Sequence, residues 1–175
     1  PKKLSSKFPV ITTVMSNLGL ENFLLQDLNI KLKRSSVGDI NVIEEMKKYA
    51  SPLGGEQSGH IILSEYSKTG DGILAALKIT EIISLIKKPS NIMFDLYDSF
   101  PQIKINIPYK KISEKNKINI NKLNNKKNID KNIRLLIRFS GTEPLIRLLV
   151  EGKDLKKVEQ KAKILEIEIR NILGR

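Results

Sequence analysis

The sequence has 175 residues, a net charge of +12 and no cysteine. This length allows one domain with a substantial core or two small domains, and the lack of cysteine excludes disulfides and thiolate zinc sites. No apolar run reaches the roughly 20 residues that span a bilayer, and no signal-peptide pattern opens the chain, so we expect a cytoplasmic protein with no membrane partner.

The first half of the chain alternates between strand and helix patterns. Apolar and β-branched runs predict strands at residues 9–15, 29–33 and 60–64. Amphipathic segments between and after them predict helices over residues 17–28, 39–49 and 71–87, with Asp39 and Asp71 as N-caps of the last two. Residues 52–55 interrupt the pattern, and the third helix is apolar on nearly all sides, so we expect it to be buried on more than one side. This order is typical of a layered α/β unit with a mostly parallel sheet.

The second half predicts a separate, small α+β domain with an antiparallel sheet packed by helices. Pro89 and Ser90 interrupt the pattern of strands and helices. We therefore place a partial α/β domain at residues 1–88, a linker at 89–99 and the α+β domain at 100–175. Strands are expected at residues 102–109, 134–139 and 145–151, the last two joined by a tight turn. An apolar stripe at steps of three and four predicts a final helix, capped by Asp154.

Half of the excess positive charge lies between residues 110 and 132. This stretch holds eight lysines and two acids, a local net charge of +6, but no arginine. Most of its other residues are asparagine and isoleucine, and from them the segment could be either a loop or a weak helix. Such a segment lacks stacking groups for bases, so we expect no specific nucleic-acid partner. Two interpretations of this stretch are possible: a segment that is simply exposed to solvent, or a surface that binds anions.

The first polar motif is Gly54-Gly55-Glu56-Gln57-Ser58-Gly59-His60. Its glycines let the backbone approach a ligand closely, and Glu56, Ser58 and His60 offer hydrogen-bonding groups for hydroxyls. A loop between helix and strand that uses glycine only for its turn geometry would have the same composition. His60 is the only histidine and the carboxylates are scattered along the sequence, so we predict no metal ligands.

The second polar motif, RFSGTEPLIR, occupies residues 138–147. A strand ends here in a turn whose Ser140 and Thr142 hydroxyls and backbone N–H groups can converge on an anion, and we expect the turn to offer no anion of its own. Arg138 and Arg147 flank the turn and suit a bidentate grip on phosphate. The alternative is an ordinary hairpin in which Arg147, in its apolar run, pairs with an internal acid such as Glu151. A P-loop is excluded because its Lys-Ser/Thr ending is absent.

Together, in this order and at this separation, the two motifs resemble the α-phosphohexomutase superfamily. Residues 54–60 resemble its sugar-recognition loop, and residues 138–147 resemble the phosphate-binding loop of its last domain. Flanking segments resemble phosphoglucosamine mutases in particular, namely residues 13–21 (TVMSNLGLE), 37–39 (VGD), 69–73 (TGDGI) and 146–152. The resemblance runs from about residue 8 to residue 173, is weakest across 110–132, and concerns the C-terminal part of that family only.

The resemblance implies an isomerase that interconverts glucosamine 6-phosphate and glucosamine 1-phosphate on the route to bacterial cell-wall precursors. In the full-length family enzyme of four domains, a phosphoserine in the first domain transfers its phosphoryl group. Mg2+, held by an aspartate-rich loop in the second domain, offsets charge at the transfer site. This chain matches neither loop, so we expect it to contain no catalytic residue and no Mg2+ ligand, and to be inactive alone.

The resemblance also assigns binding roles. The expected sugar-binding residues are Glu56, Ser58 and His60, and the expected phosphate-binding residues are Arg138, Ser140, Gly141, Thr142 and Arg147, with both loops facing one cleft. Two positions depart from the family pattern. Ile40 stands where an arginine usually follows Val-Gly-Asp, and Phe139 replaces a common basic residue.

Several alternatives stay open at this point. The chain is either a piece of a longer enzyme or the product of a truncated gene. It functions as the substrate-binding half of a phosphosugar mutase, as a non-catalytic phosphosugar- or polyanion-binding module, or as an inert remnant. A serine loop and an aspartate-rich loop encoded in frame upstream would decide for the enzyme.

Overall fold

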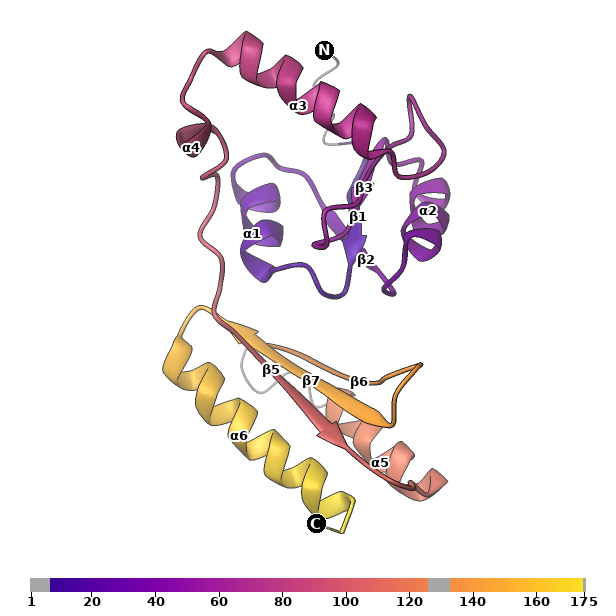
Figure 1. Cartoon of the computed structure of the whole chain (residues 1–175). Helices are drawn as coiled ribbons and strands as arrows, with labels where there is room; N and C mark the ends of the chain where they lie inside the picture. The colour runs from indigo at the N-terminus through magenta and orange to yellow at the C-terminus, as the bar shows by residue number, and fades with distance from the viewer. Residues whose placement is uncertain (1–6, 126–132, 175) are drawn as a thin grey trace. The chain divides into compact units, whose positions relative to one another are not determined.

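The chain divides into two compact units, residues 1–99 and residues 100–175, in a computed structural model that describes residues 7–125 and 133–174 (Figure 1). The residues predicted to form a linker, 89–99, belong to the first unit and include a short helix, α4 (Ser90–Met93). Tyr97, which follows α4, stacks on Phe23 with ring centroids 6.1 Å apart. Each unit has its own hydrophobic core.

The first unit is built on a four-stranded sheet in the order β2-β1-β3-β4. Its strands are β1 (Val10–Thr13), β2 (Leu32–Ser35), β3 (Leu53–Gly55) and β4 (Ile61–Leu63). β1 pairs in parallel with both β2 and β3, whereas β4 runs antiparallel to β3. The predicted α/β layer with a mostly parallel sheet is therefore confirmed.

Two helices cover opposite faces of this sheet, α1 (Leu18–Gln26) and α2 (Asp39–Lys48) (Figure 1). Successive strand side chains point to opposite faces. Accordingly, Leu32 packs with Leu24 of α1 in one buried cluster, and Ile11 packs with Val42 and Met46 of α2 in another. The sheet is thus the middle layer of an α/β/α sandwich.

The sequence predicted a break in the pattern at residues 52–55, but three of these residues, Leu53–Gly55, form strand β3. Glycine suits this strand because the helix and the next strand approach it very closely. A Cβ atom added at Gly54 would lie 2.4 Å from Met46 Sδ, and one added at Gly55 would lie 2.6 Å from the His60 carbonyl oxygen. Two adjacent glycines in a sequence predict the end of a strand. Here they lie within a strand because its neighbours leave no room for a larger side chain.

Helix α3 (Gly72–Ile86) begins at its predicted cap, where Asp71 accepts a hydrogen bond from the Leu74 N–H. The expectation that it is buried on more than one side is wrong in this structure. Ala75 is its buried residue, while Ile73 and Leu77 are more than half exposed. None of the helices within residues 7–125 and 133–174 is both long enough and apolar enough to cross a membrane.

The second unit is the predicted α+β domain, with a three-stranded antiparallel sheet in the order β5-β7-β6. Its strands are β5 (Gln102–Pro108), β6 (Ile133–Phe139) and β7 (Leu145–Gly152). The final helix α6 (Leu155–Ile172) is capped by Asp154, which accepts from the Lys157 N–H. Its stripe, which includes Val158, Ala162, Leu165 and Ile169, is buried against one face of the sheet.

The lysine-rich stretch also contributes to this core. Most of its described part is a helix, α5 (Glu114–Asn125), while residues 110–113 before it are a loop. Ile120 and Leu123 of α5 are buried in the same cluster as α6, while residues 126–132 lie outside the described residues. Ile120 is one of the isoleucines that weakened the helix prediction, yet its burial helps to hold α5 on the sheet, because tertiary packing outweighs helix propensity.

Candidate functional site

The first motif forms the tip of a β-hairpin between β3 and β4, which corrects the expectation of a loop between helix and strand. The Glu56 N–H donates to the His60 carbonyl oxygen over 2.9 Å, and the Gly59 N–H donates to the Glu56 carbonyl oxygen over 3.1 Å. Gly59 has φ of +102°, a conformation that glycine adopts without strain. These bonds hold Glu56, Ser58 and His60 on a short, closed tip.

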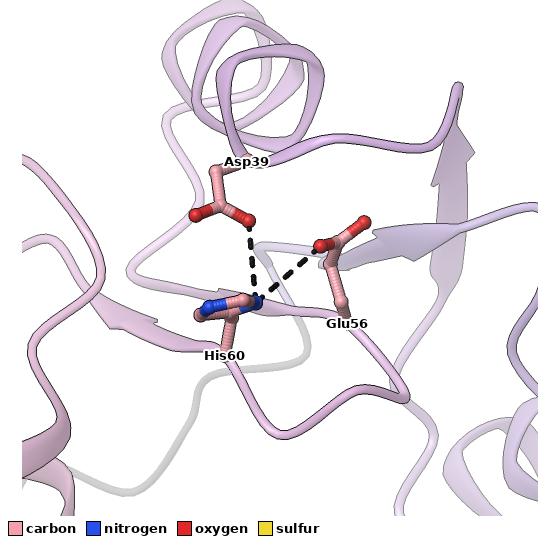
Figure 2. Close-up of side chains that lie close together, drawn as sticks. All are labelled: Asp39, Glu56 and His60. Carbon is pink, nitrogen blue, oxygen red and sulfur yellow. Dashed lines mark ion pairs between the residues drawn. The ribbon is translucent and has the colours of Figure 1, made fainter. Parts of the chain in front are cut away.

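The hairpin tip meets the start of α2 (Figure 2). His60 Nδ1 lies 3.5 Å from Asp39 Oδ1 and 3.6 Å from Glu56 Oε2, and the Ser58 hydroxyl lies 3.3 Å from the same nitrogen. The other Glu56 oxygen, Oε1, accepts from the Gly38 N–H over 2.9 Å. One carboxylate oxygen from each of Asp39 and Glu56 and a ring nitrogen of His60 all lie within 4.8 Å of one another.

Asp39 is the member of this cluster that the sequence did not predict. Gly38, with φ of +118°, occupies the N-cap position, and Asp39 is the first helical residue, so the prediction that Asp39 caps α2 is wrong. Its side chain points to His60 instead (Figure 2). Carboxylates that lie apart in the sequence thus come together beside His60 in the folded chain. Ile40, at the position where the family usually has arginine, is 72% exposed.

The second motif forms the turn between β6 and β7, as predicted. The Ser140 N–H donates to the Leu145 carbonyl oxygen over 2.8 Å and closes the turn. Gly141 and Thr142 are exposed at its tip, and a Cβ atom at Gly141 would meet nothing within 4 Å. The tip of the turn is therefore not covered by other described residues, and a ligand could reach it from solvent.

Two arginines face each other across the strands at this turn. Arg138 of β6 is the direct partner of Arg147 of β7 in the antiparallel register. Burial lowers the pKa of the Arg138 guanidinium, and the neighbouring charge of Arg147 lowers it further. Like charges directly opposite each other destabilise a sheet. The pair therefore favours an anion between or above the two guanidinium groups.

Arg147 pairs with Glu143, over 2.9 Å from Nη2 to Oε2, and its Nη2 also lies 3.4 Å from the Ser140 hydroxyl. The expectation that the turn holds no anion was therefore wrong, although this pair is exposed and such pairs contribute little. Arg147 Nε is buried and has no hydrogen-bond partner within the described structure. A buried, unsatisfied donor is costly, and a ligand oxygen would satisfy it.

The internal acid suggested as an alternative partner of Arg147 is engaged elsewhere. Glu151 is fully buried and accepts from Arg134 Nε and from Gln102 Nε2, each over 2.6 Å. In the paired strands Arg134 and Gln102 lie directly opposite Glu151, four residues along β7 from Arg147. The pairing of Arg147 with Glu151 is thus wrong.

Two consecutive family models match the chain. The model described as "Phosphoglucomutase/phosphomannomutase, alpha/beta/alpha domain III" covers residues 2–100, and that of the C-terminal domain of the same proteins covers residues 103–166. The chain belongs to this family of phosphohexomutases and corresponds to its third and fourth domains.

The curated relatives narrow the resemblance to phosphoglucosamine mutases. One from Azorhizobium caulinodans is 43% identical over 156 residues, which are 88% of this chain and 35% of the relative. Another from Fusobacterium nucleatum is 43% identical over 159 residues, which are 87% of this chain and 35% of the relative. The chain spans about a third of the length of these relatives.

Solved structures show the same fold. N-acetylphosphoglucosamine mutase of Aspergillus fumigatus, in complex with GlcNAc-6P and magnesium, superposes with a TM-score of 0.71 at 15% identity, covering 95% of this chain and 39% of that one. A phosphoglucomutase/phosphomannomutase family protein of Burkholderia thailandensis gives a TM-score of 0.73 at 17% identity, covering 93% and 38%.

Proposed function

We propose that this chain is the substrate-binding C-terminal part of a phosphoglucosamine mutase, acting on glucosamine 6-phosphate and glucosamine 1-phosphate in the synthesis of cell-wall precursors. In this role it holds the substrate while other parts of the protein supply the phosphoserine and the Mg2+ that offsets charge during transfer. The phosphate ligands are Arg138, Ser140, Gly141, Thr142 and Arg147, and the sugar ligands are Glu56, Ser58 and His60. The site of action is the cytoplasm.

The observation that carries this proposal is the pair of facing arginines at the β6–β7 turn. Arg147 Nε is a buried donor without a partner in the described structure, beside an Arg138 guanidinium whose pKa is lowered by burial and by Arg147 itself. A phosphate oxygen would accept from Arg147 Nε and would offset both positive charges. Arginine suits this task because its planar fork binds phosphate through two parallel hydrogen bonds.

The hairpin tip supports the sugar-binding half of the proposal. The Glu56 side chain is 10% exposed and is fixed by the Gly38 N–H, so its carboxylate is held in place before any ligand arrives. Ser58 and His60 beside it are exposed and offer both donors and acceptors. Preorganised polar groups of this kind position a substrate without performing chemistry on it.

The test adds glucosamine 6-phosphate or inorganic phosphate to the isolated chain. Binding of each ligand is monitored through the amide NMR signals of both loops. Glucosamine 6-phosphate is expected to shift the signals of residues 56–60 and 138–147, and inorganic phosphate only those of 138–147. Glu56→Gln removes a charged acceptor. We expect it to raise the Kd for glucosamine 6-phosphate about tenfold or more and to leave the Kd for inorganic phosphate unchanged. Glu65→Gln, an exposed residue beyond β4, is the matched control.

The outcomes separate the alternatives. If both ligands shift only residues 138–147, the chain binds phosphate without recognising the sugar, and the mutase proposal is overturned in favour of an anion-binding module. If neither ligand shifts either loop at millimolar concentration, the chain is an inert remnant. Equal losses for Glu56→Gln and Glu65→Gln would remove Glu56 from the sugar site.

A further inference from the structure

A second chemistry is available where the hairpin tip meets α2. Asp39 Oδ1, Glu56 Oε2 and His60 Nδ1 converge from three positions in the sequence onto one small volume (Figure 2). We propose that these three groups form a binding site for a first-row divalent transition cation such as Zn2+. This site shares Glu56 and His60 with the proposed sugar ligands. It is tested with metal ions alone, so it can fail without the phosphosugar role failing.

Two of the three spacings between the donor atoms are close to those found around a metal ion, and all three donor atoms lie within 4.8 Å of one another. Hydrogen bonds between nitrogen and oxygen measure about 2.7–3.2 Å. His60 Nδ1 lies 3.5 Å and 3.6 Å from the two carboxylate oxygens, beyond that range. Ligands about 2.0–2.1 Å from a tetrahedral ion lie about 3.4 Å from one another. Small side-chain movements would thus complete the coordination.

The supporting contacts hold one ligand rigidly and leave another free to adjust. Glu56 is nine-tenths buried, and its Oε1 is fixed by the Gly38 N–H at 2.9 Å, which directs Oε2 to His60. Hydrogen bonds to a ligating carboxylate of this kind orient it and raise metal affinity. Asp39 is 42% exposed, so its side chain can move toward the ion.

Charge also favours a divalent cation. Two carboxylates and a neutral imidazole carry a net charge of −2, which a divalent ion cancels. The N-terminal end of α2 lies at this site and disfavours a cation, but its partial charge is only about half a unit. A mixed set of one imidazole and two carboxylates suits Zn2+, Co2+ or Mn2+, whereas Mg2+ prefers oxygen ligands in an octahedral shell. Three protein ligands would leave one position for water.

The experiment uses the chain without a histidine tag, since His60 is then the only histidine in the protein. Zn2+ alone is added in steps while the imidazole NMR signals are recorded and the heat of binding is measured. We expect saturation at one ion per chain, with a shift of the single imidazole. Mg2+ at the same concentrations is expected to leave that signal unchanged.

Three variants and one control locate the site. His60→Ala is expected to abolish saturable binding, and Glu56→Gln and Asp39→Asn are each expected to weaken it at least tenfold, since even outer-shell partners contribute about 10- to 100-fold. Glu65→Gln is expected to bind as the unchanged protein does. Thermal unfolding of each variant establishes that it is folded. Zn2+ binding that leaves the imidazole signal unmoved, or that survives in His60→Ala, overturns the proposal, as does the absence of saturable binding.

Discussion

Replacing Arg147 by lysine separates a role in binding from a role in folding. Lysine keeps the positive charge and can retain the exposed pair with Glu143, but it loses the Nε–H and the planar fork. In the ligand-free chain Nε has no partner in the described structure, so the folded state loses no hydrogen bond there. In a phosphate complex the same group would donate to the ligand. The two states therefore respond differently to one substitution.

The expected magnitudes follow from these contacts. A charge-assisted hydrogen bond contributes about 1.5–3 kcal/mol, so Arg147→Lys is expected to raise the Kd for inorganic phosphate roughly 10- to 150-fold. The pair with Glu143 is exposed, with 39% and 54% of the two side chains accessible, and pairs of this kind contribute about 0.2–1 kcal/mol. The free energy of unfolding should therefore change by less than about 1 kcal/mol.

The assay is a phosphate titration followed by the amide signals of residues 140–142, together with urea unfolding of the same samples. Arg170→Lys is the matched control, because Arg170 is also 39% exposed and also pairs with a glutamate four residues away. The control should leave phosphate binding unchanged. If Arg147→Lys unfolds the domain at lower urea and leaves phosphate binding intact, Arg147 is a structural residue and the phosphate assignment fails.

Three further predictions concern stability and activity. Gly54→Ala should destabilise the first unit by about 1–3 kcal/mol in urea unfolding, because its methyl group would overlap the buried Met46 side chain. Gly72→Ala is the control, since its methyl group would meet nothing within 4 Å, and equal effects of the two substitutions would contradict the packing argument. Arg134→Ala should lower the free energy of unfolding, measured with urea, by about 3–5 kcal/mol, since it removes a partner of the fully buried Glu151 carboxylate. A decrease below about 1 kcal/mol would show that this ion pair is dispensable. The isolated chain should not convert glucosamine 6-phosphate in a coupled assay, and turnover clearly above a blank would show that it contains its own catalytic groups.

Local patterns in the sequence predicted much of the fold. The apolar stripe of α6, the caps at Asp71 and Asp154 and the turn at residues 140–144 each depend on neighbours within a few residues, so the sequence alone is enough to find them. The two polar motifs were visible for the same reason, because each is a continuous segment. Their family resemblance is confirmed by the matching domain models.

Contacts between distant residues were decided by the tertiary structure. Asp39 meets His60 only because β1 pairs with β3 in parallel and β3 turns back into β4, which brings the start of α2 to the hairpin tip. Glu151 is taken by Arg134 because the register of β6 and β7 places these two residues opposite each other. A change of one residue in register would move every side chain to the other face of the sheet. The sequence therefore determined the elements and their polar loops, and the register of the strands determined which charged groups meet.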